Sequence, residues 1–117
     1  MNTKTIESLS PQVVYILLAL AVKERHGYEI MKQVKHDSLG KISMGPGTLY
    51  GAIKRLLKDG WVAEAGEREL AGKVDERRRY YRLTELGRKQ LATELQRYEE
   101  TLQLARNNHI VVSAHRA

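Results

Sequence analysis

Apolar residues recur at helical spacing in four stretches of this chain, and these stretches predict its architecture. The first is the almost unbroken apolar run VVYILLALAV, which follows Ser10 and Pro11. Serine suits the position just before a helix and proline suits the first turn, so we expect a helix to begin at Pro11. Because few of its residues are polar, this helix is expected to be buried on most sides and to end between Lys23 and His26.

A second helix is predicted to start at Gly27 and to include the residues YEIMKQVKHDS. Its periodicity predicts that Lys32 and Lys35 point outward. The residues expected to face inward are Tyr28, Met31 and Val34. Gly40 is expected to end this helix, and a short extended piece is expected over residues 41–44.

A third helix is predicted by the stretch MGPGTLYGAIKRLLKDGWV. Pro46 suits the first helical turn, and Gly60 suits the left-handed residue just past a helix end. The apolar stripe that would face the core consists of Leu49, Ile53, Leu56 and Leu57. The opposite face carries Gly51, Lys54, Arg55 and Lys58. Gly47 and Thr48 at the N-terminal end are small and let another molecule approach the backbone, which is typical of a helix that enters a DNA groove.

After this helix the sequence changes to two strand-like segments joined by a polar turn. The first segment is WVAEAGERE, the turn lies within LAGKVDE, and the return strand is RRRYYRL, in which Tyr81 and Leu83 share one face. The turn carries Gly72 and Lys73, so the hairpin has a positively charged tip. Three helices and a basic hairpin predict a winged helix-turn-helix, a mainly α fold with a small β-hairpin.

Thr84 is predicted to cap a last helix that runs to about Arg106. Its apolar seam has the heptad spacing of a helix that packs against another helix: Leu91, Leu95, Tyr98, Leu102 and Ala105. Such a helix reaches over roughly 30 Å, more than a module of about 80 residues covers, so part of the seam must contact a second subunit. We therefore expect a DNA-binding domain over 1–83, a C-terminal dimerisation helix over 84–106 and a flexible tail over 107–117.

The composition favours an anionic partner. The 117 residues include 20 lysines and arginines against 14 acidic residues, which gives a formal charge of +6 and a pI near 9.7. The third helix and the hairpin concentrate this charge. There is no cysteine, which excludes disulfides, and the polar N-terminus lacks the apolar region of a secretion signal. Because the first helix is too short to cross a bilayer, we expect a cytoplasmic protein that does not contact a membrane.

The sequence lacks the motifs of common enzyme sites. Gly45-Pro46-Gly47 does not lead to the Gly-Lys-Ser/Thr of a Walker loop, and Tyr50 stands where a GxGxxG motif needs its last glycine. No Gly-x-Ser-x-Gly elbow occurs. The four histidines are too dispersed for a metal site on one helix, and no cysteine can serve as a zinc ligand. We therefore expect no enzymatic activity, no metal ion and no cofactor.

Three motifs resemble the PadR family of transcriptional regulators: HGYEIMKQV, GTLYGAIKRLLKDGWV and RRRYYRLTELGRKQL. Together with the apolar first helix, they cover nearly all of the chain between Leu9 and Arg106. The resemblance implies a homodimeric repressor of the short PadR type that reads a palindromic operator, in many relatives one with ATGT and ACAT half-sites. It also implies DNA-facing positions at Thr48, Tyr50 and Lys54. The final segment, NNHIVVSAHRA, resembles no element of the family, and its role stays unassigned.

The candidate contacts with double-stranded DNA lie on the third helix and the hairpin. They are Thr48, Tyr50, Gly51, Lys54, Arg55, Lys73, Arg77, Arg78 and Arg79. Alternation along the return strand places Arg77 and Arg79 on the face of Tyr81 and Arg78 on the other face. These arginines therefore cannot all contact one duplex, although at least one is expected to.

Plainer interpretations of the same residues stay open. The ring of Tyr50 can pack beside the apolar stripe while its hydroxyl reaches water or a phosphate. Trp61 is expected to fill the core or a subunit interface rather than to stack on a base. Charge on the outer face of a helix is also typical of an ordinary solvated surface. The alternative function is a winged-helix module that binds another protein and no DNA.

The resemblance also implies an effector site. Some PadR-like regulators bind flat aromatic compounds between their subunits, next to an aromatic side chain of the last helix. Tyr98 occupies that position here, and Tyr15 of the first helix is expected to approach it from the same side. A small aromatic effector bound at Tyr15 and Tyr98 would release the protein from DNA. The alternative is that Tyr98 only fills the subunit interface.

Overall fold

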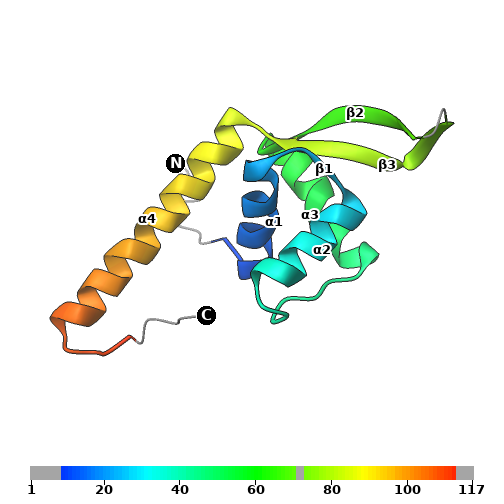
Figure 1. Ribbon diagram of the computed structural model, residues 1–117. Coiled ribbons are helices and arrows are strands. Elements are labelled where there is room, and N and C mark those ends of the chain that lie inside the picture. Colours follow the sequence, from blue (N-terminus) through cyan, green and yellow to red (C-terminus); the bar gives the residue numbers. More distant parts are fainter. Residues whose placement is uncertain (1–8, 71–72, 113–117) are drawn as a thin grey trace.

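Four helices and a three-stranded antiparallel sheet make up the described part of the chain, residues 9–70 and 73–112 of a computed structural model (Figure 1). The elements follow in the order α1 (Pro11–Val22), β1 (Arg25–His26), α2 (Gly27–Asp37), α3 (Pro46–Asp59), β2 (Val62–Leu70), β3 (Lys73–Leu83) and α4 (Glu85–Asn107). The three N-terminal helices form the body of the molecule. The β2–β3 hairpin and α4 project from this body on opposite sides.

The helix ends follow the local signals in the sequence. The Ser10 hydroxyl accepts a hydrogen bond from the Val13 N–H at 3.2 Å, which caps α1. Gly60 ends α3 in the left-handed region, at φ 79°. The Thr84 hydroxyl accepts from the Gly87 N–H at 3.0 Å and caps α4. These three predicted helix boundaries are confirmed.

Besides the predicted hairpin, the sheet contains β1, which lies where the sequence predicted only the end of a helix. β1 pairs with β3, so that Arg25 lies opposite Tyr81 and His26 opposite Tyr80, and the strand order is β1-β3-β2. The extended piece expected over residues 41–44 forms no strand. This two-residue strand forms because it can pair with the edge of β3. The residues around Arg25 and His26 contain no local sequence signal for that pairing.

The core joins α1 and α2 to the apolar stripe of α3 and to the base of the sheet. In α2 the fully buried residues are Ile30 and Val34, whereas Tyr28 is 62% exposed. The prediction that Tyr28 faces inward was therefore wrong. At 100° per residue, Ile30 and Val34 define the buried arc, and Tyr28 lies well outside it. Lys32 is exposed, as expected.

The β2–β3 hairpin is irregular. Its register shifts twice in β2, between Glu64 and Gly66 and between Glu67 and Glu69. Such bulges bend a strand and increase its twist. At the base of the hairpin Tyr81 is buried and Arg82 is exposed, which confirms the predicted alternation of faces there.

α4 packs against α1 only through its N-terminal half, and its remaining turns project away from the body (Figure 1). At its end, His109 adopts φ 64°, and the Ile110 N–H donates to the Ala105 carbonyl at 2.8 Å. This left-handed turn stops the helix and reverses the direction of the chain. The apolar residues that follow are exposed: Ile110, Val111 and Val112.

Two helical glycines differ in the space around them and give a matched test of the fold. A Cβ on Gly87 would lie 2.9 Å from the carbonyl carbon of Trp61 and 2.8 Å from a methyl carbon of Leu83, whereas nothing lies within 4 Å of a Cβ on Gly51. Gly87→Ala should lower the free energy of unfolding by about 1–3 kcal/mol through overpacking. Gly51→Ala should raise it by about 0.5–1 kcal/mol, because alanine has the better helix propensity.

Urea unfolding followed by circular dichroism at one protein concentration measures both changes. If Gly87→Ala unfolded at the same urea concentration as the unsubstituted protein, the close packing of α4 against the Trp61 backbone would be contradicted.

Candidate nucleic-acid interface

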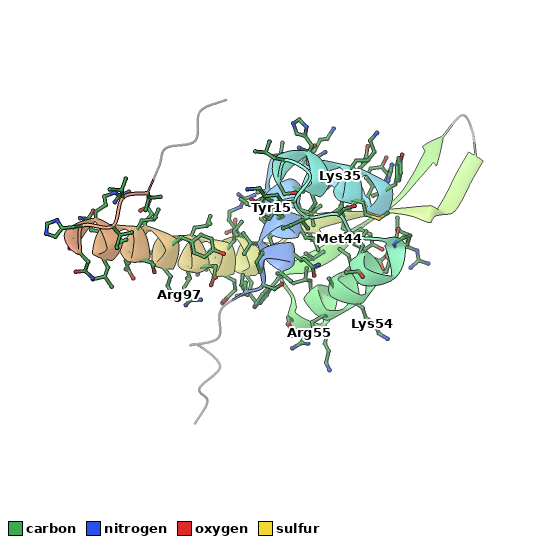
Figure 2. The ribbon with its side chains drawn as sticks, turned by 90° about the horizontal axis from the view of Figure 1, so that it is seen from below. Tyr15, Lys35, Met44, Lys54, Arg55 and Arg97 are labelled. Atoms are coloured by element: carbon green, nitrogen blue, oxygen red, sulfur yellow. The ribbon has the colours of Figure 1, made fainter. Side chains whose placement is uncertain are left out.

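α3 separates an apolar face from a basic face. Leu49, Ile53 and Leu56 are buried in the core, and Leu57 is partly buried beside them. The exposed residues of the helix include Thr48, Gly51, Lys54, Arg55 and Lys58. In Figure 2 the side chains of Lys54 and Arg55 point away from the body. The helix therefore presents three cations and a glycine to an approaching molecule, and the side chain of Tyr50 is also partly exposed, at 39%.

Tyr50 lies at the junction of α3 with α2 and the sheet. Its ring packs on Gly27, the first residue of α2, so closely that a Cβ at Gly27 would overlap the hydroxyl oxygen and lie 2.6 Å from Cζ. Burial raises the pKa of Tyr81 in β3, and nearby Tyr50 and Glu64 raise it further, while Arg79 lowers it. The interpretation in which the ring of Tyr50 packs is thus the one that the geometry favours, although the side chain stays 39% exposed.

The wing candidates are only partly described. Lys73, Arg77 and Arg78 belong to β3, but their side chains, like the turn residue Gly72, lie outside what the structure describes. Arg79 is exposed, and its Nη1 lies 3.5 Å from Oε2 of Glu64 in β2. An ion pair between two half-exposed side chains is weak, so the guanidinium can exchange the carboxylate for another anion at little cost.

The turn between α2 and α3 is fixed by a buried serine that the sequence did not single out. The Ile42 N–H donates to the Ser38 hydroxyl oxygen at 2.9 Å. Between these residues Leu39 and Gly40 both adopt positive φ, at 56° and 80°. This compact turn sets the angle at which α3 leaves α2.

A capping box joins the start of α2 to the sheet. The His26 N–H donates to Oε1 of Glu29 at 3.1 Å, and the Glu29 N–H donates to Nδ1 of His26 at 3.3 Å. The imidazole also packs edge-on against Tyr80 of β3, with ring centroids 5.3 Å apart. Glu29 three residues after His26 was a readable signal for this box, but histidine is not among the usual capping residues.

A second cluster of polar side chains lies between α1 and α4. Glu94 is only 1% exposed and forms an ion pair with Arg97. Burial raises the pKa of Tyr98, and the charge of Glu94, a hydrogen bond to its carboxylate and nearby Tyr15 raise it further, whereas Arg97 lowers it. Tyr15 lies on α1 where α4 passes it (Figure 2). The two predicted effector residues, Tyr15 and Tyr98, therefore lie in one neighbourhood.

The described ranges, 9–70 and 73–112, contain no group of three or more His, Asp or Glu side chains placed to hold a metal ion. None of the helices in these ranges combines the length and the apolar character that crossing a membrane requires.

The class of protein follows from these elements. Three helices, with a tight turn before the third, and a two-stranded wing that leads into a long C-terminal helix define a winged helix-turn-helix protein. The model of the PadR-like family of transcriptional regulators matches residues 16–93, which is most of the chain. The chain therefore belongs to the PadR-like family.

The chain is also similar to one other bacterial protein and to solved structures of transcriptional regulators. An uncharacterized protein of Lysinibacillus sphaericus is 30% identical over 90 residues, which cover 76% of this chain and 79% of that protein. A transcriptional regulator of Clostridium thermocellum is 27% identical with a TM-score of 0.67, over 82% of this chain and 87% of that chain. A PadR family regulator of Clostridium difficile is 25% identical with a TM-score of 0.70, over 84% and 97%.

A more distant structure shares the fold. Bacillus subtilis PadR, solved in complex with operator DNA, is 21% identical with a TM-score of 0.63. The similarity covers 76% of this chain and 48% of that one.

Proposed function

We propose that the protein is a homodimeric transcriptional repressor that binds a palindromic operator through α3 and the β2–β3 wing. The observation that carries this proposal is the outer face of α3, where Lys54 and Arg55 are exposed directly opposite a buried apolar stripe. A helix held in this way can enter the major groove with its cations toward the phosphates and base edges. The operator complex of Bacillus subtilis PadR, which has the same fold, supports the proposal.

The alternative, a module that binds another protein and no DNA, fits this surface less well. A protein-binding face of that kind would be expected to display an apolar patch. The exposed α3 residues near Gly51 are three cations, Lys54, Arg55 and Lys58, together with Thr48 and with Tyr50, whose ring packs on Gly27. An anionic partner with closely spaced charges matches this surface better.

Gel-shift titrations with DNA from the region upstream of the gene, across a series of salt concentrations, test DNA binding. Lys54→Ala should weaken binding to the specific site by about tenfold or more, because Lys54 lies near the centre of the exposed face. Lys58→Ala changes another exposed lysine, in the last turn of α3, and is the control that should change binding little. If no fragment is retarded at low salt, the repressor proposal is wrong.

The proposed dimer contact is the C-terminal half of α4. Leu91 is buried within its own subunit and Leu95 packs partly against the same core, so these two seam residues offer little area to a partner. Tyr98 and Leu102 are 40% and 37% exposed on turns that extend beyond the body, and Ala105 follows on the same face. A second copy that packs against this face would cover the exposed part of the seam.

Leu102→Glu should break the dimer for two reasons. The substitution removes an apolar contact, and the two-fold symmetry places the two new carboxylates close to each other. Leu104→Glu is the matched control, since Leu104 is 58% exposed but points about 160° away from Leu102 around the helix. Sedimentation velocity measures both. A Leu102→Glu variant that remains as dimeric as the unsubstituted protein would show that another surface joins the subunits.

We further propose that a planar aromatic effector binds beside Tyr98 and Tyr15 and releases the operator. Tyr98 is half-exposed, its hydroxyl is held by the Glu94 carboxylate, and Tyr15 of α1 lies nearby. Offset stacking on such rings adds about 0.5–1.5 kcal/mol to burial. A ligand between the subunits can weaken DNA binding only as far as it prefers dimers whose α3 helices are misplaced for the operator.

Titration with planar phenolic compounds and dyes, followed by Trp61 fluorescence and by operator release, tests this site. Tyr98→Ala and Tyr15→Ala should each weaken ligand binding by about fivefold or more. Tyr28→Ala removes an exposed tyrosine on the other side of the body and should leave ligand binding unchanged. Binding that is equal in all three variants would place the ligand elsewhere.

A further inference from the structure

The segment that follows α4 is both apolar and exposed. Ile110, Val111 and Val112 are 59%, 89% and 53% exposed. Single exposed apolar side chains are common on protein surfaces, but a run of three is unusual unless it serves a contact. We call these three residues the arm. Neither the core nor the proposed DNA interface uses them.

The arm leaves α4 through an ordered turn. His109 has φ 64°, its N–H donates to the Arg106 carbonyl at 3.0 Å, and the Ile110 N–H donates to the Ala105 carbonyl at 2.8 Å. These are the two hydrogen bonds of a Schellman turn, which holds the residue at the position of Ile110 beside the last helical turn. Ala105 is the last residue of the proposed dimer contact. The arm therefore continues that apolar surface beyond the end of the helix.

A second apolar surface lacks full cover on α1. Tyr15, Leu18 and Val22 are spaced three and four residues apart, so they share one stripe of the helix, which we call the α1 stripe. Tyr15 and Leu18 are partly buried, whereas Val22 is 75% exposed. Tyr15 lies where α4 passes α1, close to Tyr98 (Figure 2). The stripe thus starts at the α1–α4 contact and becomes more exposed along α1.

The arm of the same chain does not reach the far end of this stripe. α1 and α4 run in opposite directions (Figure 1), so Val22, seven residues after Tyr15, lies about 10 Å closer to the start of α4 than Tyr98 does. α4 continues for about 14 Å beyond Tyr98 in the other direction. The residues from Asn108 to Val112 span at most about 17 Å, less than this separation of about 24 Å. Only another chain can bring an arm to Val22.

A second copy of the chain can bring the two surfaces together. In an antiparallel pair of α4 helices that cross at Leu102, Tyr98 of one copy faces the turn around Ala105 of the other. Ile110 lies eight residues after Leu102, and Glu94 lies eight residues before it. The arm of one copy therefore comes level with Glu94 of the other, in the half of α4 that packs against α1.

We propose that the arm of each copy packs on the α1 stripe of a second copy, with Val111 against Leu18 and Val22. This inference rests on the proposed dimer and names a contact that the α4 seam does not supply. The exchange covers apolar surface on both chains, which is the main driving force for association. Tyr15 lies on the same stripe, so the arm of one copy also borders the proposed effector site of the other.

Disulfide formation tests this contact directly, because the chain has no cysteine of its own. Val111→Cys and Val22→Cys proteins are mixed, allowed to exchange subunits and oxidised. The expected product is a covalent dimer with one chain of each kind, identified by its mass, since a disulfide forms only between closely placed residues. Tyr28→Cys takes the place of Val22→Cys in the control. Tyr28 is 62% exposed on α2, and this mixture should give little mixed dimer.

The strength of the dimer gives a second measurement. Ile110→Ser combined with Val111→Ser should raise the dissociation constant of the dimer by about tenfold or more, because apolar surface is no longer covered. Val22→Ser should raise it by about threefold or more, and by less in the arm variant, since the two sites are then no longer in contact. Tyr28→Ser is the control and should leave it unchanged. Sedimentation equilibrium measures each constant, and circular dichroism checks that each variant is folded.

The outcomes separate the arm from the dimer on which it rests. If the unsubstituted protein sediments as a monomer, the proposed dimer and the arm contact are both wrong. If it is a dimer while the arm variant dimerises equally well and no mixed disulfide forms, the arm contact is wrong and the dimer stands. If Val111→Cys joins only to itself, the arms pair with each other and the proposed contact with α1 is overturned.

Discussion

The arrangement of this protein depends on the burial of one apolar stripe on α3. Leu49, Ile53 and Leu56 are almost completely buried, and each such side chain contributes about 1.5–3 kcal/mol when it leaves water. The stripe is buried in only one rotation of the helix about its axis. The opposite face, with Lys54 and Arg55, is therefore held toward solvent. The orientation of the charged surface thus follows from the hydrophobic contact beneath it.

Polar and close-packed contacts tie neighbouring elements together at both ends of α2. The buried Ser38 hydroxyl fixes the α2–α3 turn, the His26–Glu29 capping box joins α2 to β3, and the ring of Tyr50 fills the space above Gly27. Each contact connects different elements, so the starts of α2 and α3 and the base of the wing form one unit. A rigid unit of this kind can offer several charged groups to a duplex without ordering them anew on binding.

The two halves of α4 differ in their burial. Its first half is anchored by buried Leu91 and by Glu94, whose carboxylate is paired with Arg97. A buried carboxylate is costly unless it is paired, and Arg97, three residues further along α4, supplies the opposite charge. The second half has no such anchor, and its apolar side chains Tyr98 and Leu102 stay partly exposed. In the proposed dimer, a change in how two copies of α4 pack would move the attached winged-helix units relative to each other.

The sequence by itself determined the helices, most of their boundaries and the two faces of α3, because caps at Ser10, Gly60 and Thr84 and helical periodicity are local properties. It also carried the motifs of the family. Only the tertiary structure decided three other features: the strand at Arg25–His26, the exposure of Tyr28 and the packing of Tyr50 on Gly27. A two-residue strand needs the edge of β3, and α2 had apolar residues on more than one arc, so contacts between segments distant in the chain had to select among them.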